Sequence, residues 1–382
     1  CRLFSKKEDT MQDLFSNALS SLVSKHIKLS PSRRETLTWL AFLMIQQGTI
    51  CLWRLAAYVK TDAHTASVRR RFYRFFQFEK LEVGLIARVI IDVLHLSDKP
   101  FVLAMDRTNW DFGTTPINIL MISVMFKGVG IPLIWTLLPG AGNSHTDART
   151  GLLDQLFKTY PDLKIASLTG DREFIGDAWM RYLDSHKIPF ILRLRENQHV
   201  VREGFATLTI AHIARNLQRG KSMILKGSCR LGQHVADTSP RVRLVILRLK
   251  TGELLALACS GRPRQALDRY RCRWTIETLF GNLKTKGFNL EDTHITNAEK
   301  LSTLLCVLAL SVALAVKTGA GMAKLKPIPL KKHGRKAWSV FALGLCTLRK
   351  MISTARPDHA IIFLKQLISP KLPTNSLKYI PF

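Results

Sequence analysis

Acidic residues stand at three points of the sequence where folding could bring them together. Asp106 closes the apolar run FVLAM, and Asp171 follows a second apolar run, KIASLTG, so both carboxylates are expected at or near the ends of core strands. Glu277 lies in a third segment, about Arg264–Lys286, which follows Pro263 and has helical periodicity. Taken singly, an aspartate beside a strand is more often a turn or capping residue. A chemical role depends on the three carboxylates meeting at one place.

A polar stripe runs along the helical segment that contains Glu277. At about 100° per residue, Tyr270, Arg273, Glu277 and Lys284 fall within about 60° of one another. The stripe borders an apolar side that faces the core, so the glutamate is expected to meet the two aspartates at a sheet edge. An ordinary ion pair between Arg273 and Glu277 is the alternative interpretation, but it leaves the rest of the stripe unexplained.

Three clustered carboxylates suit two divalent metal ions. Such ions prefer hard oxygen ligands, and a pair of them stabilises both the attacking and the leaving oxygen of a phosphodiester displacement. Mg²⁺ is the expected ion, with Mn²⁺ as a substitute. The arginine and the lysine of the stripe would neutralise phosphates, and the tyrosine would pack on a sugar or donate a hydrogen bond.

The charge of the chain points to a polyanionic partner. Among 382 residues, Lys and Arg number 57 and Asp and Glu 28, which gives a formal net charge of +29. That balance is far from the near-neutral charge of a metabolic enzyme. Hydrophobic residues make up 47% of the chain, which excludes a disordered basic tail.

The seven cysteines include no CxxC pair and no Cys/His cluster at ligand spacing, so neither a zinc site nor a disulfide framework is expected. The sequence shows no secretory signal, and we expect a reducing compartment such as the cytoplasm. Met11 is the first plausible start, so residues 1–10 are read as possible extra upstream translation. The apolar run Leu301–Val316 has 16 residues, fewer than the roughly 20 that span a membrane. A buried core helix is favoured, and no membrane partner is expected.

Residues 11–97 have helical periodicity and are expected to form a small helical DNA-binding domain. One short helix gathers arginines among aromatic residues: Arg69, Arg70, Phe72, Tyr73, Phe75 and Phe76, with Arg71 and Arg74. The alternative is that the aromatic residues belong to the core and the arginines to a solvated face, but the charge of the whole chain favours DNA contact.

Residues 98–320 are expected to form a mixed α/β domain. The apolar runs Phe101–Asp106, Ile117–Phe126 and Ile131–Leu137 predict three strands, and the turn at Gly128 makes the last two an antiparallel hairpin. Helix and strand then alternate, which describes a mixed sheet flanked by helices. Residues of about 197–262 break this alternation and predict a β-rich insertion. Residues 321–382 form a basic region in which prolines limit helix length.

The residues in the polar stripe resemble those of the DDE transposases of the insertion-sequence-4 family. That family's signature is Tyr, two residues, Arg, three residues, Glu, six residues, Lys, and the stripe matches it without a gap. The DREF sequence at Asp171–Phe174 and the AMDRTNW sequence around Asp106 resemble the family's two aspartate motifs. The resemblance covers about Leu37–Leu348, including GRKAWSVFALGL from Gly334.

The resemblance implies a ribonuclease-H-like catalytic domain and cut-and-paste DNA transposition. Asp106, Asp171 and Glu277 would be metal ligands, and Tyr270, Arg273 and Lys284 would contact the transposon end. Water, and then a freed 3′-hydroxyl, would attack phosphorus in line. The implied partner is double-stranded DNA, as terminal inverted repeats and as target, bound by a homodimer in the synaptic complex. The implied location is the bacterial cytoplasm, at the nucleoid.

Two alternatives and one departure from the family stay open. The chain is either an active transposase or a catalytically silent DNA-binding remnant of one, and an enzyme of the same fold that only hydrolyses nucleic acid is a third possibility. Relatives that excise through a DNA hairpin stack a flipped base on an aromatic residue of the insertion. Here Trp179 is expected on a helix, and Trp110 or Phe205 are the remaining candidates.

Overall fold

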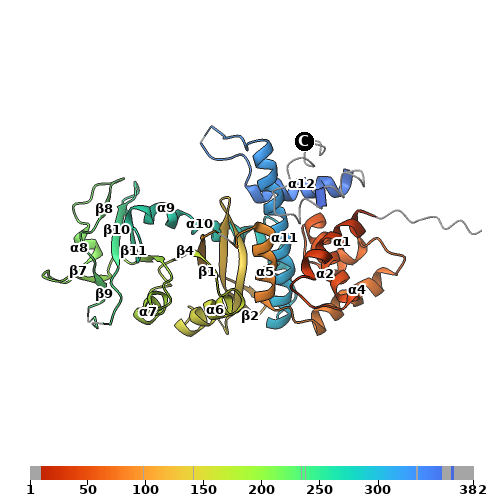
Figure 1. Ribbon diagram of the computed structural model, residues 1–382, viewed down its shortest axis with the longest axis horizontal. Coiled ribbons are helices and arrows are strands. Elements are labelled where there is room, and N and C mark those ends of the chain that lie inside the picture. Colours follow the sequence, from red (N-terminus) through yellow and green to blue (C-terminus); the bar gives the residue numbers. More distant parts are fainter. Residues whose placement is uncertain are drawn as a thin grey trace, which may run out of the picture.

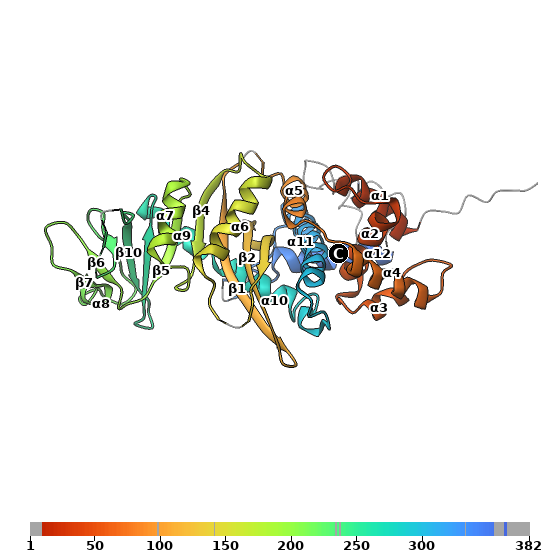
Figure 2. The same cartoon turned by 90° about the horizontal axis from the view of Figure 1, so that it is seen from below.

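The molecule is elongated: the N-terminal helices form one end, and the strands extend from the middle to the other end, where short helices accompany them (Figure 1, Figure 2). The structure, a computed structural model, describes residues 10–97, 99–140, 142–233, 235–236, 238–332, 334–354 and 363–364. The possible upstream segment, apart from residue 10, and the prolines at 357, 370, 373 and 381 lie outside these ranges.

The N-terminal part is helical, as expected. Its helices are α1 (Met11–Val23), α2 (Pro31–Gln47), α3 (Leu52–Ala57), α4 (Thr65–Phe78) and α5 (Val83–Leu94). A capping box between Thr10 and Asp13 begins α1, and Gly48, with φ of 64°, ends α2 in the left-handed region. The α4 helix is amphipathic: it buries Val68, Phe72, Phe75 and Phe76 and turns most of its arginines outward.

An eight-stranded mixed sheet forms the centre of the fold. Its first five strands are β1 (Phe101–Phe112), β2 (Thr115–Phe126), β3 (Val129–Leu137), β4 (Ile165–Gly170) and β5 (Phe190–Leu194). They lie in the order β3-β2-β1-β4-β5, with β2 antiparallel to its two neighbours and β4 parallel to both β1 and β5. Helices α6 (Thr146–Thr159) and α7 (Asp177–Ser185) precede β4 and β5. This arrangement confirms the expected mixed, ribonuclease-H-like α/β fold.

The hairpin between β2 and β3 is also confirmed. Its two-residue turn places Lys127 at φ of 51° and Gly128 at φ of 81°, the positive angles that tight antiparallel hairpins favour.

The predicted β-rich insertion extends the central sheet. The segment contains β6 (His199–Val201), β7 (Leu208–Thr209), α8 (Ile210–Ile213), β8 (Ser222–Ile224), β9 (Arg230–Leu231), β10 (Arg243–Arg248) and β11 (Leu254–Cys259). Strand β11 pairs with β5, and β10 and β8 continue outward from it, while β7, β6 and β9 make a separate small sheet. The insertion is therefore anchored to the first five strands of the sheet by backbone hydrogen bonds.

The single helix expected over about 264–286 is wrong. The chain forms a 3₁₀ turn, η1 (Pro263–Gln265), followed by α9 (Ala266–Arg271) and α10 (Trp274–Leu283). At the junction the Arg273 N–H donates to the Tyr270 carbonyl at 2.9 Å, a three-residue spacing that overwinds the backbone. The Thr275 hydroxyl donates to the Cys272 carbonyl at 2.7 Å and supports the bend. The polar stripe is therefore divided between two helices.

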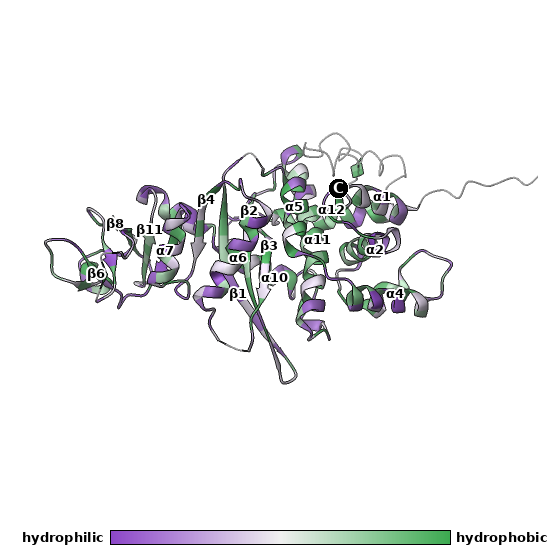
Figure 3. Ribbon diagram, turned by 60° about the horizontal axis from the view of Figure 1, so that its bottom comes forward, coloured by the Kyte–Doolittle hydropathy of each residue, from purple (hydrophilic) through white to green (hydrophobic). Residues whose placement is uncertain are grey.

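The expected core helix is present and longer than its apolar run. It extends over Ala298–Leu325 as α11, after a short 3₁₀ turn, η2 (Leu290–Asp292). By length and composition α11 resembles a membrane span, yet 94% of its most apolar window is buried inside the protein. Figure 3 shows this mostly hydrophobic helix beside α5 and α12 (Val340–Thr354). It packs against α2, α5, α12 and β3, so that one hydrophobic core joins the helical end to the sheet.

Candidate active site

Strand register brings the two aspartates together. The parallel pairing of β1 with β4 ends at Met105 opposite Gly170, so Asp106 and Asp171 are the next residues on neighbouring strands. The expectation that Asp106 ends its strand is wrong, because β1 continues to Phe112. It continues because β2 still pairs with it after β4 has stopped.

Arg273 connects the first acid to the third. Its side chain is 5% exposed, and its guanidinium lies 3.0 Å from Asp106 Oδ2 and 2.6 Å from Glu277 Oε1. Asp171 Oδ1 lies 3.5 Å from the Tyr270 hydroxyl, and the guanidinium carbon of Arg273 is 5.7 Å from the centre of the tyrosine ring. Arg273 thus contacts Asp106 and Glu277 directly, Asp171 is linked to it through Tyr270, and the meeting of all three acids at one metal site stays a prediction.

The carboxylates influence one another electrostatically. The pKa of Asp106 is raised to about 6, chiefly by burial and to a smaller extent by the negative charges of Asp171 and Glu277, while the Arg107 N–H and Arg273 lower it. Burial also raises the pKa of Tyr270 to about 12, so its hydroxyl stays protonated near neutral pH and remains a donor.

The raised pKa of Asp106 predicts a pH-dependent stability in buffer with a metal chelator. The folded protein binds this proton more tightly than the unfolded chain does, so the contribution is complete below 3.8, the ordinary pKa of an aspartate, and is lost as pH rises through about 6. Replacing Asp106 by Asn should remove this dependence. Between pH 4 and 8, wild type should lose on the order of 2 kcal/mol more of its free energy of unfolding than the variant does, measured by urea denaturation. Equal pH slopes for the two proteins would contradict the assignment.

Lys284, at the end of α10, contacts β1 beyond Asp106. Its ammonium donates to the Asn109 carbonyl at 2.9 Å, pairs with Glu291 at 2.9 Å and lies 5.2 Å from the centre of the Trp110 ring. The three residues predicted to contact DNA therefore lie in two places. Tyr270 and Arg273 contact the acidic residues, whereas Lys284 contacts the end of β1 that contains Asn109 and Trp110.

The aromatic candidates differ in exposure. Trp179 is fully buried on α7, and Trp110 is 8% exposed beneath Lys284. Phe205, in the insertion, is 62% exposed, and the Arg202 guanidinium lies 4.1 Å from its ring centre.

Comparison with known proteins gives the family. A family model described as the transposase DDE domain matches residues 98–314, more than half of the chain. The chain belongs to the transposase DDE domain family. A search of curated proteins gave no match. Among solved structures, the transposase is similar to the piggyBac transposase in a synaptic complex with hairpin DNA, at 13% identity and a TM-score of 0.43, over 97% of this chain and 82% of that one.

Members of this family generally use divalent metal ions. The candidate ligand atoms of this transposase are of a type that suits such ions. Asp106, Asp171 and Glu277 supply only carboxylate oxygens, the ligands that Mg²⁺ prefers. As the side chains lie, however, no group of three His, Cys, Asp or Glu in the described ranges is arranged to hold a metal. The Arg273 guanidinium instead supplies the positive charge between Asp106 and Glu277.

Sequence reasoning missed a clamp on the loop of the second acid. Glu253, in the turn between β10 and β11, accepts hydrogen bonds from Arg172 at 2.7 Å and from Arg193 at 2.6 Å. Arg193 on β5 is also 3.9 Å from Asp171. Since Glu253 belongs to the insertion, only the fold brings it to this loop, although an arginine within the otherwise apolar strand FILRL was a usable signal for Arg193.

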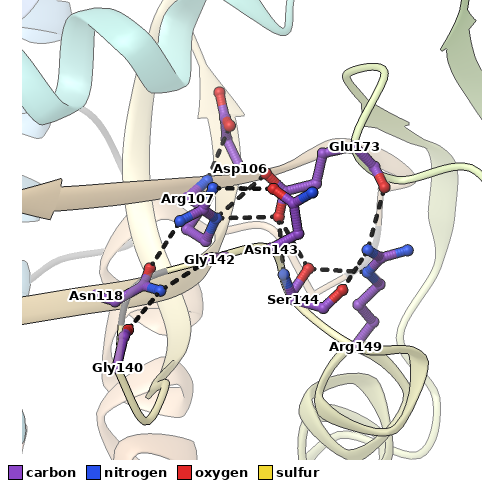
Figure 4. A network of polar contacts seen from close by, with 9 residues as sticks. All are labelled: Asp106, Arg107, Asn118, Gly140, Gly142, Asn143, Ser144, Arg149 and Glu173. Atoms are coloured by element: carbon purple, nitrogen blue, oxygen red, sulfur yellow. Dashed lines mark hydrogen bonds and ion pairs between the residues drawn. The ribbon is translucent and has the colours of Figure 1, made fainter.

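A second network, also missed, joins the residues that follow the two aspartates (Figure 4). Arg107, directly after Asp106, donates through Nε to the Glu173 carboxylate at 3.1 and 3.2 Å. Its other nitrogens reach Asn118 at 3.2 Å and Asn143 at 3.3 Å. This arginine therefore ties β1 to the loop that follows β4.

Glu173 is fixed from its other side by the start of α6. The Ser144 hydroxyl donates to its carboxylate at 3.0 Å, and the Ser144 N–H does so at 3.2 Å. Arg149, 5% exposed, donates to the Glu173 carbonyl at 3.1 Å and to the serine hydroxyl at 2.9 Å. Because this network is largely buried, it restricts the distance between the strand of Asp106 and the loop of Asp171.

Proposed function

We propose that this transposase catalyses cut-and-paste transposition of an insertion sequence through strand cleavage and strand transfer at the element ends. The observation that supports this most is the register of β1 and β4, which makes Asp106 and Asp171 neighbours, with Glu277 linked to Asp106 through one arginine. The spacing of Tyr270, Arg273, Glu277 and Lys284 supports assignment to the insertion-sequence-4 family. The alternative is a catalytically silent remnant that only binds DNA.

In the proposed mechanism Asp106, Asp171 and Glu277 hold two Mg²⁺ ions, for which Mn²⁺ can substitute. Bound there, the ions would activate the attacking oxygen and stabilise the leaving oxygen of an in-line displacement. Arg273 leaves its bridge between Asp106 and Glu277 and pairs with a phosphate of the transposon end, whose two non-bridging oxygens can accept a bidentate pair of hydrogen bonds from the guanidinium as a carboxylate does. Tyr270 donates to the DNA backbone and Lys284 neutralises a further phosphate. Water attacks first and the freed 3′-hydroxyl second, without a covalent protein–DNA intermediate.

The N-terminal helices are proposed to bind the terminal inverted repeats. Residues 11–97 would form this domain, 98–320 the catalytic domain with its insertion at about 197–262, and 321–382 a basic C-terminal region. On α4, Arg69, Arg70, Tyr73 and Arg74 are all exposed, which gives a basic face with an aromatic side chain on it. Cut-and-paste chemistry needs two ends at once, so the active form is proposed to be a homodimer, acting at the bacterial nucleoid.

The test is a strand-cleavage and joining assay with Mg²⁺ and DNA that carries the element's own ends. Wild-type protein should cut and join, and Glu277→Gln should lose both reactions by at least about a thousandfold, because removal of a metal-binding carboxylate abolishes charge stabilisation in the transition state. Glu203→Gln, whose carboxylate is 90% exposed, is the control. If wild-type protein binds the ends but leaves every phosphodiester intact under Mg²⁺ and Mn²⁺, the silent alternative replaces the proposal.

A further inference from the structure

The connection between α11 and α12 forms a projecting arm (Figure 1). We name residues 326–339 the basic arm. Within the part of it that the structure describes, Leu330 and Lys336 form an isolated β-bridge. The Lys331 N–H donates to the Arg335 carbonyl at 2.8 Å, and the Ala337 N–H donates to the Pro329 carbonyl at 2.8 Å. These backbone bonds give the arm a hairpin-like form rather than that of an unrestrained linker.

The basic arm is strongly cationic in composition. Its exposed cations are Lys326, Lys331, Lys332, Arg335 and Lys336. The sequence has no Asp or Glu between Glu299 and Asp358. Two large apolar side chains of the arm are also exposed, Leu330 at 68% and Trp338 at 56%. A projection of this composition suits an anionic partner with flat apolar surfaces, such as nucleic acid.

A groove at the base of the arm continues this surface toward the active site. Trp338 lines the groove together with α10, the residues after it and α12, which contribute Thr278, Asn282, Lys286, Arg349 and Lys350. Among the described lining residues there are three cations and no carboxylate. Thr278 directly follows Glu277 on α10. A strand in the groove would therefore pass beside the helix that carries the third acid.

The basic arm and the proposed end-binding face of α4 lie at opposite ends of α11. The start of α11 is beside the end of α4, where Lys80 pairs with Glu299 at 2.8 Å. The arm begins where α11 ends, 28 residues later, which corresponds to about 42 Å at 1.5 Å per residue. The transposase thus has two separate basic surfaces.

We propose that the basic arm and the α10–α12 groove bind the phosphate backbone of the target duplex. This inference rests on the proposed function. Lysine and arginine contacts to phosphates respond to charge and carry no direct sequence information. The element end has a fixed sequence, whereas the target changes with each insertion, so a lysine-rich surface of this kind suits the target.

The test removes three arm charges in the full-length protein, with Lys331→Ala, Lys332→Ala and Lys336→Ala combined. The control removes three exposed charges elsewhere, with Lys158→Ala, Lys164→Ala and Lys250→Ala combined. Fluorescence anisotropy without divalent ions measures affinity for a random-sequence duplex and for a duplex of the element end. The arm variant should bind the random duplex at least about tenfold more weakly than the control. Its slope of log affinity against log salt should be smaller by about 2.7, from three lost phosphate contacts at roughly 0.9 each.

A strand-transfer assay with precleaved ends completes the test. The arm variant should lose transfer into target in proportion to its lost affinity, while its cleavage of element ends matches the control. Equal affinity of the arm and control variants for the random duplex would overturn the proposal, and so would a loss confined to the element end. If wild-type protein neither cleaves nor joins DNA, the proposed function fails, but the binding comparison still decides whether the arm holds a duplex.

Discussion

Arg273→Ala is expected to lower the rate of strand cleavage by at least about a hundredfold. The change removes the cation between two partly buried carboxylates, Asp106 and Glu277, which lie 3.0 and 2.6 Å from it. Loss of one partner from a buried ion pair typically costs about 3–5 kcal/mol because a charge is left unpaired. The variant should therefore also unfold at lower urea concentration, and the two effects are separated by measuring single-turnover cleavage well below the unfolding transition.

Two further variants make the Arg273 prediction specific. Arg273→Lys keeps the charge but cannot reach both carboxylates with a planar fork, so its cleavage rate should lie between those of wild type and Arg273→Ala. Arg271→Ala is the matched control, because that side chain is 77% exposed and pairs with Asp268, which is also exposed. Cleavage by Arg273→Ala at the rate of the Arg271 control would show that this guanidinium has no part in the reaction.

Glu173→Gln should reduce cleavage by about tenfold or more with little change in affinity for the element end. Glu173 accepts from Arg107 and Ser144 at 3.0–3.2 Å, and the charge-assisted bond to the arginine is the strongest of these. A neutral amide leaves Arg107, 16% exposed, without its counter-charge. Asp106, next to Arg107 on β1, and Asp171, two residues before Glu173 in the loop after β4, then lose a fixed separation. This change affects the reaction more than DNA binding.

Two further variants distinguish a role of Glu173 in the reaction from a general loss of stability. Glu173→Asp should restore part of the cleavage rate, because it restores the charge with a shorter side chain. Glu203→Gln, whose carboxylate is 90% exposed, serves as the control. The role assigned to this network is refuted if the cleavage rate of Glu173→Gln is that of the control, or if end binding falls as much as cleavage does.

The local sequence pattern was sufficient to predict the strands and the core helix that surround the candidate site. Alternating or continuous apolar runs identified the strands that carry Asp106 and precede Asp171, and the apolar run at Leu301–Val316 identified the core helix. The break before α10 was missed, because periodicity does not distinguish three-residue from four-residue hydrogen bonds at one junction.

The sequence pattern could not predict contacts between residues that are far apart in the chain. Glu253 is 60 residues from Arg193 in the sequence and 81 from Arg172. Nothing in a turn between two strands marks its glutamate as a partner for the loop of Asp171. The pairing of β11 with β5 brings that turn to the loop, so the clamp follows from sheet order. The same holds for Arg107 and Glu173, which meet only because β1 and β4 are neighbours.

The central claim is that Asp106, Asp171 and Glu277 share a metal site. The most direct test measures Mn²⁺ binding to the free protein by electron paramagnetic resonance, with Mg²⁺ as competitor. Asp106→Asn, Asp171→Asn and Glu277→Gln should each weaken Mn²⁺ binding by at least about tenfold, and Asp111→Asn, further along β1, should not. Mn²⁺ binding that is the same in wild type and all three variants, or absent from the folded wild-type protein both alone and with the element end, would contradict a shared metal site.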